Sequence, residues 1–176
     1  MSLRSLPAAL GLLAALAAPA AAHVVLDQSE APAGSYVRLA FRVGHGCAGA
    51  ATTAIRVNLP PELPSARPMP HPGWTLTIGG GAEAADHSGH GAHHGAAHHA
   101  APPPGEIAWT GGPLGDAFYD EFVLFIRTPA EAGRVLAFPV VQECEGGAVA
   151  RWVEQAPRPG ERVANPAPLL RVVERR

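Results

Sequence analysis

The fold class is decided by the stretch Tyr36-Val37-Arg38-Leu39-Ala40-Phe41-Arg42-Val43. In it, the apolar residues Val37, Leu39, Phe41 and Val43 alternate with residues expected to face outward. Alternation with a period of two is typical of a β-strand that packs one face on a core. Similar apolar runs recur along the chain, at residues 55–59, 74–78, 107–109, 122–126, 135–141, 149–153 and 169–173. Together with an opening segment at Val24 and Leu26, they predict eight or nine short strands.

Turn-forming residues separate these runs. The chain contains 20 glycines and 19 prolines, which interrupt it too often for long helices. We therefore expect an all-β fold, an immunoglobulin-like antiparallel β-sandwich. The proline-rich stretch 60–72 is predicted to be an extended crossover rather than a strand.

Residues 82–105 do not follow the strand pattern. They are mostly Ala, Gly, His and Pro, so we expect a flexible, disordered loop inserted between two strands. This segment contains six of the nine histidines: His87, His90, His93, His94, His98 and His99. Imidazoles without fixed geometry favour weak, multi-site metal capture, and a bare insertion is the alternative.

Residues 1–22 have the three parts of a secretory signal. Arg4 provides a positive charge, residues 8–18 are apolar, and Ala20-Ala21-Ala22 supplies small residues for cleavage. The apolar run is too short to span a bilayer comfortably, which disfavours a transmembrane anchor. We expect residues 23–176 to form one periplasmic domain with no stable membrane anchor.

The cysteines and the charge restrict the function further. Thiolate metal sites use closely spaced cysteines, whereas Cys47 and Cys144 lie far apart in the sequence. Because exported proteins meet oxidising conditions, we expect a disulfide between them. Two free thiols are the alternative. The formal net charge is −2 and no basic cluster is present, which argues against a nucleic-acid partner.

Cleavage after Ala22 makes His23 the first residue of the mature chain. Its free α-amino group and imidazole Nδ1 can then close one chelate ring on a metal ion. Nitrogen ligands in a planar arrangement favour Cu(II), and Met69 is the only thioether left for Cu(I). The alternative is an incidental N-terminal histidine.

Two further histidines lie outside the histidine-rich segment. His45, in Gly44-His45-Gly46-Cys47, follows the second expected strand, where a turn can present its side chain to a metal or only to solvent. His71, between Pro70 and Pro72, is a weaker candidate, for which a surface position is favoured.

Several segments, taken in order, resemble the YcnI-like domain family of exported copper-binding proteins. They are His23-Val24, residues 33–36, 52–57, 72–74, 106–112 and 138–142, and the stretch from Gly146 to Trp152. The resemblance implies an immunoglobulin-like sandwich that binds Cu(II) through a brace formed by the N-terminal histidine. It also implies a carboxylate after the second strand and a tryptophan nearby.

His23 matches the brace histidine of this family, and Trp152 matches the tryptophan near the metal. The carboxylate is a departure, because residues 44–49 contain no Asp or Glu. His45 lies near that position and is our candidate for a third nitrogen ligand.

These features favour a binding protein, a periplasmic Cu(II) chaperone or carrier in copper acquisition or homeostasis. Its partners would be copper ions and, for transfer, another periplasmic copper carrier or a membrane copper transporter. We expect no enzymatic activity. A copper-dependent oxidative enzyme of the histidine-brace type is the alternative, but only Tyr36 and Tyr119 could serve as its axial tyrosine. A structural sandwich with a metal-buffering loop is a third interpretation.

Overall fold

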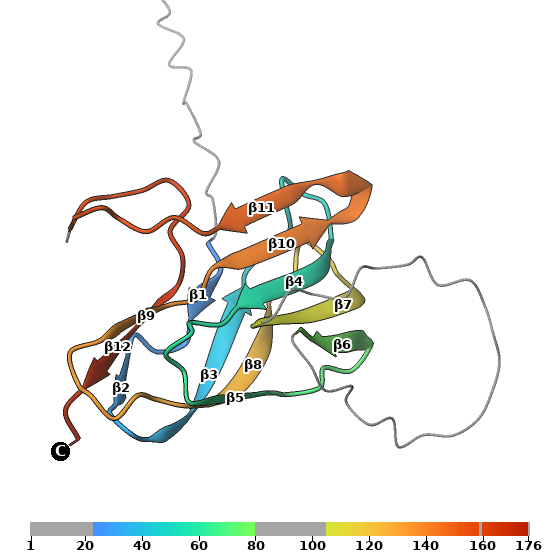
Figure 1. Ribbon diagram of the computed structural model, residues 1–176. Helices are drawn as coiled ribbons and strands as arrows, with labels where there is room; N and C mark the ends of the chain where they lie inside the picture. The colour runs from blue at the N-terminus through green and yellow to red at the C-terminus, as the bar shows by residue number, and fades with distance from the viewer. Residues whose placement is uncertain (1–22, 80–104, 159, 176) are drawn as a thin grey trace, which may run out of the picture.

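The computed structural model describes residues 23–79, 105–158 and 160–175 (Figure 1). Within these ranges the regular structure consists of twelve β-strands and one short 3-10 helix, η1 (Glu145–Gly147), which confirms the all-β class. The expected signal segment 1–22 lies outside the described residues, as does the histidine-rich insertion apart from Gly105.

Two sheets form the sandwich. The first contains, in spatial order, β1 (Val25–Leu26), β3 (Tyr36–Val43), β8 (Asp120–Arg127) and β5 (Ser65–Pro68). The second contains β11 (Val149–Trp152), β10 (Val140–Cys144), β4 (Thr52–Asn58), β7 (Glu106–Leu114) and β6 (Trp74–Ile78). A third sheet contains β2 (Glu30–Pro32), β12 (Leu169–Val173) and β9 (Val135–Ala137).

The core lies between the two large sheets because each strand alternates inward and outward residues. Leu39, Phe41, Ile55, Trp109 and Leu124 are all 0 % exposed. Burying one such side chain contributes about 2 kcal/mol to folding.

A disulfide joins the two sheets of the sandwich. Cys47 follows β3 of the first sheet, and its partner Cys144 is the last residue of β10 in the second. The disulfide expected from the sequence is therefore confirmed.

Two expectations about the strands were wrong. Within residues 60–72, Ser65–Pro68 forms the edge strand β5 against β8. An edge strand tolerates proline because only one of its sides needs backbone donors. The run 135–141 forms two strands, β9 in the third sheet and β10 in the second, separated by Phe138 and Pro139. Pro139 has no backbone N–H for a continuous ladder, which suits a change of sheet.

The strand pairing also departs from a wholly antiparallel sandwich. β12 pairs in parallel with β2, with Arg171 opposite Glu30, and antiparallel with β9. The C-terminal strand therefore lies beside a strand from the start of the domain (Figure 1). None of the described residues belongs to a helix long and apolar enough to cross a membrane.

Candidate metal centre

His23 lies two residues before the first residue of β1, at the edge of the first sheet. β1 pairs antiparallel with β3, and Val25 lies opposite Arg42. The pairing ends at Val25 and Arg42, so His23 lies just beyond the paired residues, at the end of β3 that leads into the His45 turn. The two histidines that the sequence analysis selected therefore belong to neighbouring segments at one end of β3.

The His23 imidazole is half-buried and is held on two sides. Its ring centroid lies 4.9 Å from that of Trp152, with an interplanar angle of 59°. Its Nε2 atom lies 3.2 Å from the carbonyl oxygen of Ala164. A proton on Nε2 can be donated to this carbonyl, and the Nδ1 lone pair is then available to a metal ion.

The loop that carries Ala164 is fixed by Glu154. The Glu154 backbone N–H donates to the Asn165 carbonyl at 2.9 Å, and its carboxylate accepts the Asn165 backbone N–H at 3.0 Å. The hydrogen bond from the Asn165 backbone N–H to the carboxylate is the main reason that the pKa of the Glu154 carboxyl lies below its usual value. The carbonyl that contacts His23 is therefore part of an ordered turn.

Trp152 is 5 % exposed, and its indole nitrogen is hydrogen-bonded inside the protein. Nε1 donates to Oε1 of Gln142 on β10, at 3.4 Å. Gln142 is itself 1 % exposed. Its Nε2 donates to the His45 carbonyl and to Thr52 Oγ1, both at 2.8 Å. One buried amide thus connects the tryptophan beside His23 with the turn that carries His45.

The turn after β3 is tight. A Cβ atom at Gly46 would lie 1.7 Å from the Ala50 carbonyl oxygen, so this position requires glycine. The Gly46 backbone N–H donates to Asp116 Oδ1 at 2.9 Å, and the part-buried His45 ring contacts the Gly46 carbonyl through Nδ1 at 2.5 Å.

Asp116 is the residue that sequence reasoning missed. It lies between β7 and β8 and brings a carboxylate to the 44–49 turn, which has none of its own. The two segments are separated by 70 positions in the chain, and no local pattern connects them.

Among the described residues, no group of three or more His, Cys, Asp and Glu side chains is arranged to hold a metal ion. A chelate that uses an α-amino group needs fewer side chains. The histidines His87, His90, His93, His94, His98 and His99, expected to capture metal, lie outside the described residues.

His71 occupies a different environment from the one expected for a surface residue. Its Nε2 atom lies 2.8 Å from Asp120 Oδ2, and its ring centroid lies 5.1 Å from that of Phe122. The His71 side chain is only 16 % exposed. It is therefore a partly buried, hydrogen-bonded residue on the β8 side of the sandwich.

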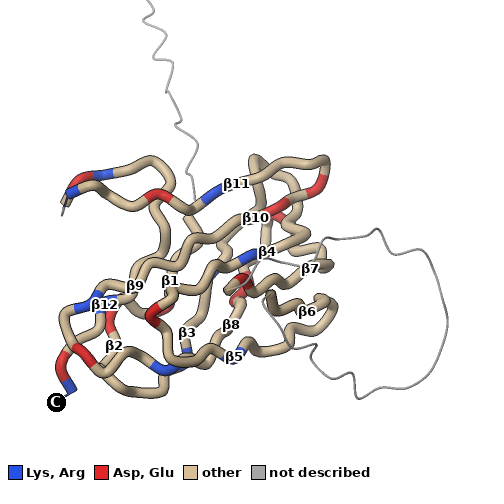
Figure 2. Tube along the Cα trace, in the orientation of Figure 1, with Lys and Arg blue, Asp and Glu red and all other residues tan. Residues whose placement is uncertain are grey.

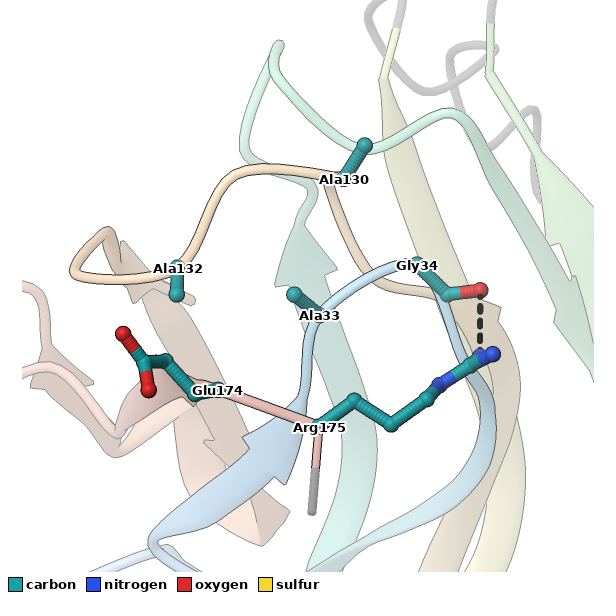
Figure 3. A pocket seen from close by; sticks show the side chains of 6 residues that line it. All are labelled: Ala33, Gly34, Ala130, Ala132, Glu174 and Arg175. Atoms are coloured by element: carbon teal, nitrogen blue, oxygen red, sulfur yellow. Dashed lines mark hydrogen bonds between the residues drawn. The ribbon is translucent and has the colours of Figure 1, made fainter.

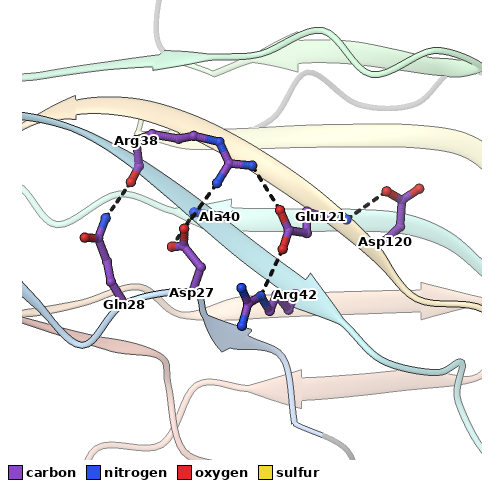
Figure 4. Close-up of polar contacts among 7 residues, drawn as sticks. All are labelled: Asp27, Gln28, Arg38, Ala40, Arg42, Asp120 and Glu121. Atoms are coloured by element: carbon purple, nitrogen blue, oxygen red, sulfur yellow. Dashed lines mark hydrogen bonds and ion pairs between the residues drawn. The ribbon is translucent and has the colours of Figure 1, made fainter.

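A charged cluster covers part of the outer face of β3 and β8 (Figure 4). Glu121 accepts hydrogen bonds from Arg38 and Arg42, both at 2.9 Å, and Arg38 also donates to Asp27 at 3.1 Å. The hydrogen bonds from Arg38 and Arg42 lower the pKa of Glu121, and the bond to Glu121 raises the pKa of Arg42.

A groove begins at His23. It has a volume of about 740 Å³ and is lined by His23, Val135 and Leu169, with Glu154, Arg158 and Arg162 among its charged residues. Val135 and Leu169 are 54 % and 49 % exposed. The histidine is therefore accessible to another molecule from one side.

The model for the domain of unknown function DUF1775 matches residues 23–172. The chain is also similar to the crystal structure of an uncharacterized protein from Nocardia farcinica, described as having an immunoglobulin-like fold. The identity is 29%, the TM-score is 0.61, and the match covers 86% of this chain and 98% of that one. The immunoglobulin-like sandwich expected from the sequence agrees with this similarity. No curated protein matches the chain.

Proposed function

The chain belongs to the DUF1775 family, and we propose that it is an exported, YcnI-like Cu(II)-binding protein that carries copper in the periplasm. The copper ion is the cargo. Its principal ligands are the α-amino group and Nδ1 of His23, after cleavage behind Ala22.

The observation that carries the proposal is the contact between His23 Nε2 and the Ala164 carbonyl, at 3.2 Å. An N-terminal histidine chelates through Nδ1, so a hydrogen bond from Nε2 selects the useful tautomer. Trp152 packs against the same ring at 4.9 Å and restricts its rotation. Both contacts reduce the entropy that the imidazole loses when it binds a metal ion.

The turn after β3 is the proposed source of further ligands. It carries the His45 imidazole, and the Asp116 carboxylate is hydrogen-bonded to Gly46. Gln142 connects the turn with Trp152, whose ring contacts His23. Nitrogen ligands in a tetragonal arrangement suit Cu(II). We propose His45 as the third nitrogen ligand.

A carrier must release its metal to another protein. The groove beside His23 supports this role, because a second protein's ligands can approach the site from its open side. The proposed receivers are another periplasmic copper carrier or a membrane copper transporter, and the six histidines of residues 82–105 would collect metal ions before transfer. We propose no catalytic reaction for the site.

The test is Cu(II) titration followed by electron paramagnetic resonance. The protein begins at His23 and carries serine at the six histidines of residues 82–105, so that only the principal site is observed. We expect one nitrogen-rich Cu(II) signal. Acetylation of the His23 α-amino group should abolish it, because the acetylated nitrogen can no longer close the chelate ring with Nδ1.

Two matched variants locate the remaining ligands. His45→Gln should change the nitrogen hyperfine pattern, whereas His71→Gln, which alters a histidine paired with Asp120, should leave it unchanged. If acetylation leaves the signal intact, His23 is an incidental first residue and the proposal fails.

A further inference from the structure

An exposed aromatic pair lies on the outer face of the first sheet. Tyr36 and Phe125 are 61 % and 48 % exposed, although side chains of this size usually lie in a core. Their ring centroids are 5.5 Å apart and the planes are nearly parallel, at 12°. The pair forms a continuous apolar surface on the middle strands of the sheet.

Arginines surround this aromatic pair. Register places Tyr36 opposite Arg127 and Phe125 opposite Arg67, and the Arg127 guanidinium carbon lies 5.8 Å from the centre of the Tyr36 ring. Figure 2 marks basic positions along β3 and β5. Arg38 is neutralised by Asp27 and Glu121, whereas Arg67 and Arg127 form no ion pair within the described ranges.

The surface is hollowed where these groups meet. A pocket of about 340 Å³ is lined by Tyr36, Phe125, Ser65 and Arg67. Ligand pockets start near this size. In the part of the chain that the structure describes, the Ser65 hydroxyl makes no side-chain hydrogen bond. The pocket therefore offers an exposed aromatic surface, a hydroxyl group and a cation.

We propose that this pocket binds an acidic sugar unit of a polysaccharide. The C–H face of the sugar ring packs on the exposed surface of the Tyr36–Phe125 pair, Ser65 hydrogen-bonds a sugar hydroxyl, and Arg67 pairs with the carboxylate. Arg127, over the Tyr36 ring, adds positive charge beside the pocket. A flat aromatic acid would leave the Ser65 hydroxyl without a partner, which is unfavourable for a polar group that loses contact with water.

The position of the pair argues against the insertion of these residues into a lipid surface. Tyr36, Phe125 and Arg67 belong to neighbouring strands of one sheet face, whereas membrane-inserting residues need to project from the protein. The pocket is also separate from His23. β3 has eight residues, with Tyr36 at one end and the His45 turn beyond the other, so the two places lie about 24 Å apart.

The test is a titration of the whole isotope-labelled protein with trigalacturonate, followed by backbone amide shifts in NMR spectra. The shifts should be confined to β3, β5 and β8. Arg67→Gln and Arg127→Gln should each weaken binding about fivefold, as expected for exposed ion pairs. Tyr36→Leu should weaken it by a similar factor, about fivefold, through loss of ring stacking.

Arg151→Gln is the matched control, because Arg151 is an exposed strand arginine without an ion pair in the described part of the chain. It should bind the trisaccharide as the unmodified protein does. Each variant's amide spectrum also reports whether it is folded, and Arg67→Lys, which retains the charge, should preserve part of the affinity.

Three results would overturn the proposal. If neutral maltotriose bound as tightly as trigalacturonate, the arginines would have no part in recognition. Acetate producing the same shifts at equal carboxylate concentration would show that any small anion suffices. Shifts produced by phosphatidylglycerol vesicles but not by trigalacturonate would identify a lipid surface instead.

Discussion

Two polar clusters in the same sandwich differ in charge and burial. The cluster around Gln142 is neutral and lies inside the protein, where Gln142, Thr52 and Trp152 are 1 %, 0 % and 5 % exposed. The cluster around Glu121 is charged and open to water, because the Arg38 and Arg42 side chains are 52 % and 50 % exposed (Figure 4).

This difference shows which cluster determines geometry. A buried amide must satisfy its hydrogen bonds, so few arrangements of its neighbours are acceptable. Exposed ion pairs are replaced by water at little cost, and each contributes about 0–1 kcal/mol. The neutral cluster therefore orients Trp152 and the His45 turn, while the charged cluster mainly covers the outside of the sheet.

The largest expected effect comes from the disulfide beside the neutral cluster. Replacing Cys47 and Cys144 with alanine should lower the free energy of unfolding by about 2–5 kcal/mol, because the unfolded chain loses a long-range constraint. Urea denaturation measures this change. A decrease below about 0.5 kcal/mol, the level of an ordinary surface substitution, would show that the two sheets need no covalent link.

The next effect tests the buried amide itself. Gln142→Leu should lower the free energy of unfolding by about 2 kcal/mol, because buried partners such as Trp152 Nε1 lose their hydrogen bonds. The matched control is Gln155→Leu, at an exposed glutamine, which should change stability by less than about 0.5 kcal/mol. Equal effects of the two substitutions in thermal or urea unfolding would show that the buried amide is no more important for stability than an exposed one.

The smallest effect belongs to the charged cluster. The pKa of Glu121 is lowered in the folded protein, so its contribution is present above the ordinary carboxyl pKa and is lost as pH falls through the folded value. Glu121→Gln should therefore cost less than about 1 kcal/mol near neutral pH, allowing for solvent screening. Thermal midpoints of both proteins should converge in acid, and also at high salt. A difference between the two thermal midpoints that grows in acid would contradict the lowered pKa of Glu121 in the folded protein.

The sequence predicts the core strands well because their pattern is local. Leu39 and Phe41 are buried as the alternation predicts, although Ala40 between them is buried as well. The disulfide was also predictable, since it follows from the number of cysteines and the expected compartment. The split at Pro139 was missed because strand patterning does not show which sheet a strand joins.

The candidate site was predictable only in part. His23 was selected from the expected cleavage site and Trp152 by resemblance, and the structure brings their rings together. Asp116 and Gln142 have no recognisable local signal, because their roles depend on partners that are distant in the chain. Polar residues of this kind acquire a role through tertiary contacts rather than through periodicity.

Both ends of the domain are joined to distant parts of the chain, and this determines when the molecule can be completed. The contact from His23 to Ala164 and that from Arg175 to Gly34 each span 141 positions (Figure 3). β2 likewise has no partner strand until β12 exists. Native contacts between residues so far apart in the sequence form slowly, on a timescale of about milliseconds to seconds. During synthesis, the surroundings of His23 are among the last to assemble, so an incomplete chain does not yet possess them.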